Sequence, residues 1–143
     1  MAPFTLTVPS ELRMLSVVRA FVEAVCRTAE LDRAATHAIV LVTGEAASNV
    51  IRHAHQDRPE LPLQVSCRLG PETMEVQIID EGKPFHLDAV PHLDPGEMRV
   101  GGRGVFLMRT LMDELSCEPR PNGGNVLRML KRWAASAQVR ECG

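Results

Sequence analysis

Three short segments of the sequence combine residue types and spacing that could perform chemistry, and the first is Glu45-Ala-Ala-Ser-Asn49. Glu45 and Asn49 are four residues apart, so in a helix both project from one face, and Arg52 extends that polar stripe. An Asn carboxamide oxygen is a hard ligand suited to Mg²⁺, and a nearby Glu could orient or deprotonate a nucleophile. A solvated helix face is the simpler interpretation of a single Glu–Asn pair, so this segment alone predicts no function.

The second segment, Asp80-Glu-Gly82-Lys-Pro-Phe85, directly follows an expected strand. An Asp at the end of a strand can accept a hydrogen bond from an exocyclic amine. Gly82 permits either a close approach of another group or a positive φ. Taken by itself, the segment fits a plain Asp-Glu-Gly turn.

The third segment is the glycine cluster Gly101-Gly102-Arg103-Gly104, which runs into an expected helix. Free N–H groups at a helix start, together with glycines that let the backbone curl, form an anion-binding concavity, and Arg103 would add a cation. The cluster is neither a Walker A loop nor the Rossmann fingerprint, because the required Lys-Ser/Thr pair and the third glycine are missing. A flexible hinge remains the other interpretation.

The order of the three segments carries more information than any one of them. A helix with Glu45 and Asn49, a strand-end Asp80 and a glycine-rich helix start resemble the ATP-binding (Bergerat) fold of the GHKL superfamily. Within it, the sequence most resembles the anti-sigma-factor serine kinases of the RsbW/SpoIIAB type. The likeness extends from about Phe4 to Lys131 and is densest in residues 45–55, 80–85 and 101–115.

The resemblance implies a role for each matching position. Asn49 would coordinate Mg²⁺ and bridge it to the ATP phosphates, and Glu45 would be the general base that activates a protein serine hydroxyl. Asp80 would bind the adenine amino group, with Gly82 under the base, and residues 86–100 would form the ATP lid. Further nucleotide contacts are implied for Arg52, Phe85, Gly101, Gly102, Arg103, Gly104, Val105 and Asn125, with phosphate held by the amides of Gly102 and Gly104.

The sequence departs from the family pattern at three positions. Val50 stands where Ala is common, and His55 stands where an aromatic residue often follows His-Ala. Asn125 replaces a Thr that helps the Asp hold adenine, so either Asn125 substitutes for it or the adenine pocket differs slightly. None of these changes removes a phosphate or metal group, so nucleotide binding follows more directly than kinase turnover.

These segments need elements that position them, and hydrophobic periodicity predicts those elements. A strand over 4–8 precedes two helices, the first capped by Ser10 and the second by Asp32 and running to about Ala54. A hairpin over 63–79, a helix over 104–113 and a hairpin over 115–130 follow. The prediction is an α+β two-layer sandwich in which a mixed, mostly antiparallel sheet is covered on one face by three helices. We expect a single domain over 1–143, with a nucleotide-binding core at about 32–131.

Composition excludes several classes of protein. The 143 residues carry 16 Lys and Arg against 18 Asp and Glu, and aromatic residues make up 3% with no Tyr, which argues against nucleic acid and anionic lipid as direct partners. The four cysteines lack metal-ligand spacing, so we expect three buried reduced thiols and one thiol at Cys142 in the tail. No export signal and no apolar run of membrane-spanning length is expected, which together predict a cytoplasmic protein.

The function implied by the resemblance is an ATP- and Mg²⁺-dependent serine kinase that also acts by binding. It would sequester a sigma factor and phosphorylate a STAS-domain anti-anti-sigma factor in a partner-switching pathway. The alternative is an ATP-binding partner-switch regulator that binds its protein partner without phosphotransfer. A histidine kinase catalytic domain fits poorly, because no helix with a phosphoacceptor His is expected before the domain. The resemblance also implies a homodimer, for which the apolar first helix and first strand offer a face.

Overall fold

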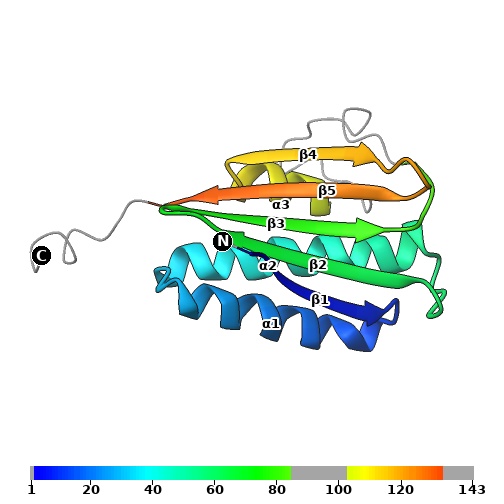
Figure 1. The fold of residues 1–143 in the computed structure, drawn as a ribbon, viewed down its shortest axis with the longest axis horizontal. Helices are drawn as coiled ribbons and strands as arrows, with labels where there is room; N and C mark the ends of the chain where they lie inside the picture. Colours follow the sequence, from blue (N-terminus) through cyan, green and yellow to red (C-terminus); the bar gives the residue numbers. More distant parts are fainter. Residues whose placement is uncertain (1, 85–102, 134–143) are drawn as a thin grey trace, which may run out of the picture.

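The computed structural model describes residues 2–84 and 103–133. The predicted strands and helices follow one another along the chain in the predicted order. They are β1 (Phe4–Pro9), the 3₁₀ turn η1 (Leu12–Met14), α1 (Leu15–Thr28), α2 (Arg33–Asn49), the π-helical turn η2 (Val50–Ala54), β2 (Pro62–Leu69), β3 (Thr73–Asp80), α3 (Arg103–Leu111), β4 (Glu114–Pro119) and β5 (Asn125–Arg132). Figure 1 shows the strands as one layer with the helices behind them.

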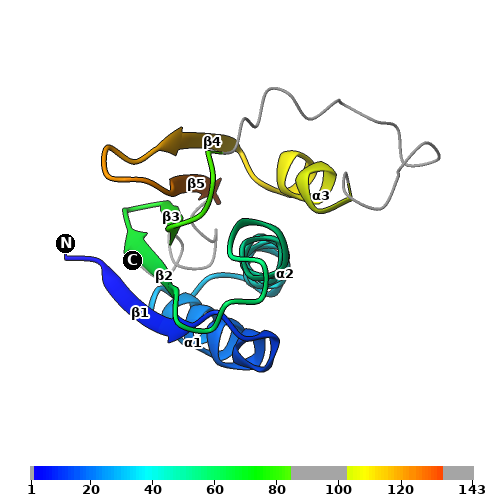
Figure 2. The same ribbon diagram turned by 90° about the vertical axis from the view of Figure 1, so that its right-hand side faces the viewer.

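The five strands form one open sheet in the order β1-β2-β3-β5-β4, and every one of its four pairings is antiparallel. Seen along the sheet, all three helices lie on the same side of it (Figure 2). This arrangement confirms the predicted two-layer α+β sandwich. The register of β3 and β5 places Asp80 directly opposite Asn125, which brings the second chemical segment beside the last strand.

Strict alternation in the strands explains why one face of the sheet is buried. In β3, every second residue from Met74 to Asp80 is buried, and the residues between them are half-buried. The buried side chains of β2 and β3 pack with the inner faces of α1 and α2, as shown by Val22 and Ile39, neither of which has exposed area. Each such side chain contributes roughly 1.5–3 kcal/mol when it is fully buried. Packing against the sheet thus fixes α2, the helix that carries Glu45 and Asn49.

The two predicted helix caps have different outcomes. Asp32 caps α2 as expected, since its Oδ1 accepts a hydrogen bond of 2.7 Å from the Ala35 backbone N–H. The prediction for Ser10 is wrong, because Glu11 precedes the 3₁₀ turn and no side chain caps it. The buried Ser10 hydroxyl faces inward and forms a hydrogen bond with Nδ1 of His55 instead. The Ser10 hydroxyl, which the local sequence predicts as a helix cap, is therefore bonded to His55, 45 residues away.

The second predicted helix is continuous in the chain but changes its winding. After Asn49 it becomes a π-helix, and the His55 backbone N–H donates to the Val50 carbonyl over 2.7 Å. Single π turns inside helices occur frequently at functional sites. The third helix ends at Leu111, two residues earlier than expected, and the Lys131 ammonium donates to the Leu111 carbonyl at its C-terminus.

The expectation that no segment has membrane-spanning character needs correction. Residues Arg33–Ala54 form a 22-residue helical stretch that is long and apolar enough, by length and composition, to cross a membrane. More than half of its most apolar 18-residue window is buried within the fold, where the helix belongs to the core. Packing against the sheet is therefore enough to explain its apolar composition.

Candidate functional site

The first and third chemical segments meet where α3 begins. A Cβ placed on Gly104 would lie 2.9 Å from Asn49 Nδ2 and 3.5 Å from Glu45 Oε2. Contacts under 3.0 Å essentially never occur for real Cβ atoms, so only glycine lets α3 approach this face of α2 so closely. The fold thus brings together two segments that are more than fifty residues apart in the sequence.

A cavity of about 370 Å³ opens beside this contact. Asn49, Asp80, Val105 and Asn125 all line it, so it joins residues from all three chemical segments and from the last strand. Its other walls are formed by Ala46, Val50, His53, Ala54, Lys83, Pro84, Met108, Cys117 and Leu127. A largely apolar cleft of this size with a few convergent polar groups is typical of a small-molecule site.

Asp80 is the buried carboxylate of the cavity, with 5% of its surface exposed. Its Oδ1 accepts hydrogen bonds from the Gly82 backbone N–H at 2.8 Å and from Asn125 Nδ2 at 3.1 Å. Within the described part of the chain, no hydrogen bond reaches Oδ2. One carboxylate oxygen is therefore held by the protein, and the other remains for a donor inside the cavity.

Asn125 fixes this corner of the site from the opposite strand. Its Nδ2 also donates to the Lys83 carbonyl at 2.7 Å, so a single amide ties Asp80 to the segment that follows it. The preceding Gly124 has a φ of +93°, and a Cβ there would lie 1.9 Å from the Asp80 carbonyl oxygen. The Arg120 guanidinium donates to the same oxygen at 3.0 Å. The turn between β4 and β5 thus holds the main chain of Asp80, and the first residue of β5 holds its side chain.

Gly82 serves close approach rather than an unusual backbone angle. A Cβ at this position would lie 2.6 Å from both the Cβ and the carbonyl oxygen of Ala54, the last residue of η2. Among the described glycines, positive φ values belong to Gly123 and Gly124. Close approach and a positive φ were the two reasons predicted for glycine at position 82, and the structure supports close approach.

His55 is a site-shaping residue for which the sequence predicted no role. Its ring is buried, and its Nε2 accepts a 2.9 Å hydrogen bond from the Glu81 backbone N–H. Because Nε2 accepts, the neutral ring carries its proton on Nδ1 and donates it to the Ser10 hydroxyl. Burial lowers the pKa of His55, against the opposing influence of the Asp80 and Glu81 carboxylates. No local sequence signal identifies this role, because the bonding partners of His55 are 45 and 26 residues away.

Cys117 contributes a neutral wall to the cavity. Burial raises the pKa of its thiol to about 11, and the neighbouring Asp80 and Glu118 carboxylates act in the same direction. The thiol is therefore protonated at neutral pH and behaves as a small apolar group beside Met108 and Leu127. Strand alternation alone does not show that these three side chains share a cavity, so sequence reasoning missed them.

The remaining predicted residues lie at varying distances from this cavity. Glu45 is partly buried at the α2–α3 contact and is not among the lining residues, and Arg52 is exposed and does not line the cavity. Arg103 is the first residue of α3. Phe85, Gly101, Gly102 and the expected lid over 86–100 lie outside the described residues.

The donor set around Asn49 suits a magnesium ion that is carried by a nucleotide. Across residues 2–84 and 103–133, no cluster of three or more His, Cys, Asp or Glu could hold a metal ion by itself. Mg²⁺ is usually bound through one or two protein oxygens, with substrate phosphates and waters completing its shell. The Asn49 carboxamide, in the cradle that Gly104 leaves open, fits that pattern.

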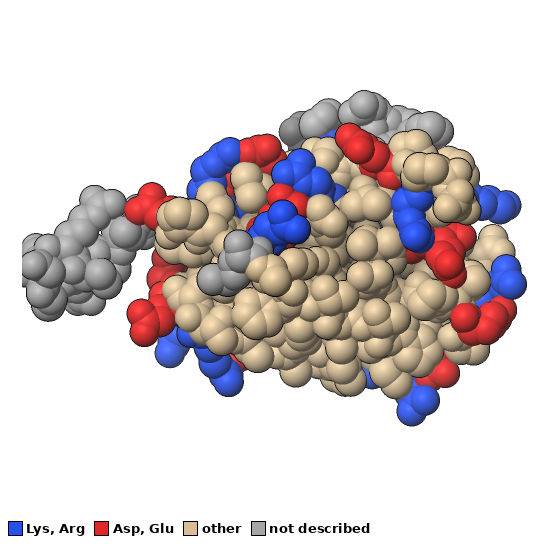
Figure 3. Space-filling model, in the orientation of Figure 1, with Lys and Arg blue, Asp and Glu red and all other residues tan. Residues whose placement is uncertain are grey.

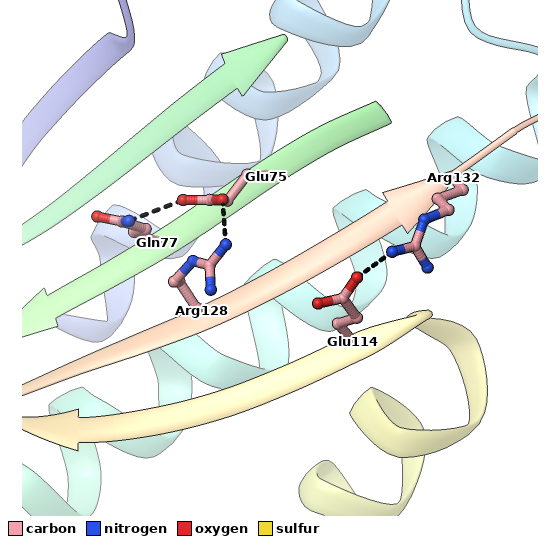
Figure 4. Close-up of polar contacts among 5 residues, drawn as sticks. All are labelled: Glu75, Gln77, Glu114, Arg128 and Arg132. Atoms are coloured by element: carbon pink, nitrogen blue, oxygen red, sulfur yellow. Dashed lines mark hydrogen bonds and ion pairs between the residues drawn. The ribbon is translucent and has the colours of Figure 1, made fainter. Parts of the chain in front are cut away.

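The opposite face of the sheet has a different character. Arg128 pairs with Glu75 at 2.7 Å, and Arg132 pairs with Glu114, as Figure 4 shows. Exposed pairs of this kind contribute little to stability, about 0–1 kcal/mol each. Figure 3 shows charged side chains gathered over the β4 and β5 part of this face, while a broad uncharged area covers β1 and β2. The face therefore separates into a charged half and an uncharged half.

Comparison with known proteins gives consistent results. Residues 8–131 match the model of the histidine kinase-like ATPase domain. The serine-protein kinase RsbW of Halalkalibacterium halodurans is 31% identical over 88% of this chain and 80% of its own length. The serine-protein kinase RsbW of Listeria monocytogenes is 28% identical over 78% of this chain and 76% of its own length.

A similar fold is found in a solved structure of the RsbU and RsbW domains of a Mycobacterium tuberculosis protein. The two superpose with a TM-score of 0.68 at 16% sequence identity. The match covers 96% of this chain but only 34% of that protein, so the chain spans about a third of it.

Proposed function

This chain belongs to the histidine kinase-like ATPase family, among its RsbW-type serine-protein kinases, and on that premise we propose that it is an anti-sigma factor with ATP-dependent serine kinase activity. It sequesters a sigma factor and phosphorylates a serine of a STAS-domain anti-anti-sigma factor. The observation that carries the proposal is the approach of Gly104 to Asn49 and Glu45 at the edge of a cavity that contains Asp80.

ATP fits the polar groups of the cavity. The Oδ2 atom of Asp80 accepts from the adenine amino group, and the base lies against apolar walls that include Val105 and Leu127. This arrangement needs no stacking aromatic ring, in agreement with the 3% aromatic content. The N-terminal turn of α3 directs backbone N–H groups toward the phosphates, because the start of a helix favours anions.

Phosphoryl transfer depends mainly on positioning and charge neutralisation. The Asn49 carboxamide oxygen would hold Mg²⁺, which when bound would supply positive charge to neutralise the phosphates. Glu45 lies one helical turn before Asn49, and in the proposed mechanism its carboxylate accepts the proton of the attacking serine hydroxyl. The proposal also includes Arg103, the first residue of α3, among the nucleotide-binding residues.

The partners follow from the same premise. The proposal includes a sigma factor, a STAS-domain antagonist and a second copy of the chain, acting in the cytoplasm without direct contact to nucleic acid or membrane. For the second copy, the α1 and β1 side is the candidate face, because the sheet beside it is uncharged and Val17 of α1 is 42% exposed. We also propose a single domain over 1–143 with its nucleotide-binding core at about 32–131.

One observation favours the alternative of a regulator that binds ATP and its partner without phosphotransfer. The Glu45 carboxylate lies against α3 and is not among the residues that line the cavity. A general base must come within hydrogen-bonding reach of the hydroxyl that it deprotonates. Kinase activity therefore requires the carboxylate to reach the substrate serine when the partner binds.

The test is a phosphotransfer assay with a STAS-domain protein encoded in the same genome. With Mg·ATP, the wild-type chain should convert one serine of that protein to phosphoserine, as detected by mass spectrometry. Glu45→Gln should retain Mg·ATP binding and lose transfer, whereas Asn49→Ala should lose both. Glu23→Gln, on the exposed side of α1, is the matched control and should behave as wild type.

Three results separate the hypotheses. Mg·ATP binding without transfer to any STAS-domain protein would support the regulator without phosphotransfer. Transfer that survives Glu45→Gln would exclude Glu45 as the base. Unchanged Mg·ATP binding in Asn49→Ala, measured by calorimetry, would remove the basis of both hypotheses.

A further inference from the structure

We propose that His55 is a positioning residue for the adenine end of the nucleotide site, and that its protonation weakens nucleotide binding in mild acid. This inference rests on the ATP-binding part of the proposed function. It concerns a buried histidine whose two ring nitrogens bond to segments at the ends of β1 and β3.

His55 joins three segments that are far apart in the sequence. Its Nδ1 is bonded to the Ser10 hydroxyl at the end of β1, and its Nε2 accepts from the backbone N–H of Glu81 beyond the end of β3. Ser10 and His55 are each only 1% exposed. With both ring nitrogens engaged and water excluded, the ring has one orientation and one tautomer.

The bond to Glu81 acts directly on the residue that would bind adenine. Glu81 follows Asp80, and the next backbone N–H, that of Gly82, donates to the Asp80 carboxylate at 2.8 Å. The Glu81 N–H thus anchors the segment to His55, and the Gly82 N–H orients the Asp80 carboxylate. The close approach of Gly82 to Ala54, the residue before His55, fixes the same segment from the same side.

Asn125 holds the Asp80 side chain from the opposite strand, but it does not replace this anchor. Its amide bonds Asp80 Oδ1 and the Lys83 carbonyl, whereas the N–H of Glu81 has His55 as its partner. A phenyl ring at position 55 would fill the space and leave that N–H without an acceptor. The contribution of His55 to the site is therefore its Nε2 atom, which accepts the hydrogen bond from the Glu81 N–H.

Protonation would reverse the role of the ring. The imidazolium ion has two N–H donors and no acceptor, so it cannot accept from Glu81. The carboxylates of Asp80 and Glu81 favour the charged ring, and the Arg58 guanidinium and burial oppose it. Burial is the largest of these influences and lowers the pKa of His55 below its usual 6.5. The anchor is therefore intact at neutral pH and is lost only in acid.

The test is calorimetry of Mg·ATP binding by the intact chain from about pH 7.5 to about pH 5.5, a range that spans imidazole titration. His55→Gln supplies an amide oxygen to accept from Glu81 but cannot titrate, and exposed His37→Gln on α2 is the matched control. We expect the ratio of wild-type to His55→Gln affinity to fall several-fold over this range. Protonation of ATP itself affects both proteins equally and cancels in the ratio.

His55→Phe removes the acceptor at every pH, and we expect about tenfold weaker Mg·ATP binding even at neutral pH, because a buried N–H is left unsatisfied. Thermal melts establish that each variant is folded at the pH of measurement. If His55→Phe does not fold, the comparison with His55→Gln still decides the question.

A constant affinity ratio across the pH range would overturn this inference alone, as would wild-type affinity in a folded His55→Phe. Absence of Mg·ATP binding by the wild-type chain at every pH would overturn the proposed function together with it. The tautomer offers a readout that needs no nucleotide. Nitrogen-15 NMR at neutral pH should show a proton on Nδ1 of His55, and a proton on Nε2 would contradict the geometry.

Discussion

Gly104 at the start of α3 lies so close to Asn49 of α2 that a methyl group at position 104 would come within 2.9 Å of the Asn49 amide nitrogen. The contact joins the expected phosphate-binding helix to the expected magnesium ligand. Position 104 is therefore sensitive to any added side chain, and the atom that such a side chain would first meet is the end of the Asn49 side chain. A larger residue there can displace the Asn49 amide without displacing the backbone.

Gly104→Ala should therefore weaken nucleotide binding much more than it weakens the fold. We expect at least about tenfold lower Mg·ATP affinity, equivalent to about 1.4 kcal/mol, with a melting temperature close to that of the wild type. Calorimetry and thermal melts measure the two effects. Thr110→Ala, at an exposed position of the same helix, is the control. An equal loss of affinity in both variants would contradict a specific effect of the contact between Gly104 and Asn49, because any change in α3 would then weaken binding.

The sequence predicts a structural feature correctly when the contact that fixes the feature lies between residues close together in the chain. The cap at Asp32 was predicted, because its partner is three residues away, and strand alternation predicted the buried face of β3. The cap at Ser10 was wrongly predicted, because the decisive partner is His55.

The same distinction applies to the candidate site. Glycine spacing predicted that position 104 would belong to the site, but not that the glycine faces Asn49. Cys117 and Leu127 enter the cavity only through the pairing of β4 with β5, and the π turn after Asn49 has no recognisable sequence signal. Residues brought together by sheet register and helix winding thus need the three-dimensional structure.

Asn125→Ala should loosen Asp80 and lower both stability and nucleotide affinity. The change removes the donor that bonds Asp80 Oδ1 and the Lys83 carbonyl, and loss of a buried partner costs about 1–3 kcal/mol. Urea denaturation measures the first effect and calorimetry with Mg·ATP the second. Asn125→Thr, whose hydroxyl can still donate to Asp80, should recover part of the affinity. Asn122→Ala, at an exposed position of the preceding turn, should change neither quantity.

Cys117 offers a chemical probe of the cavity. Burial and nearby carboxylates raise the pKa of its thiol to about 11, so the reactive thiolate is scarce at neutral pH and increases about tenfold per pH unit below that value. Alkylation by iodoacetamide, followed by peptide mass spectrometry, should accelerate accordingly between about pH 7 and pH 9.

Mg·ATP should slow that alkylation of Cys117, because the thiol lines the cavity that the nucleotide would fill. Cys67 is the internal control, since it is fully buried in the core and burial raises its pKa to about 12. Nucleotide should leave its low reactivity unchanged. Equal protection of both cysteines would indicate general tightening of the fold and not occupancy of the cavity.

The stability of the protein without nucleotide should fall as the pH drops below about 6.5 because of His55. Burial lowers the pKa of this ring in the folded chain, so between the folded pKa and 6.5 the unfolded chain binds more protons. The free energy of unfolding therefore rises with pH through that window and levels off above it. Urea titrations at several pH values should show this slope, and His55→Gln should flatten it. His37→Gln, at an exposed position on α2, should keep the slope. A slope of equal size in wild type and His55→Gln would assign the pH dependence to other groups.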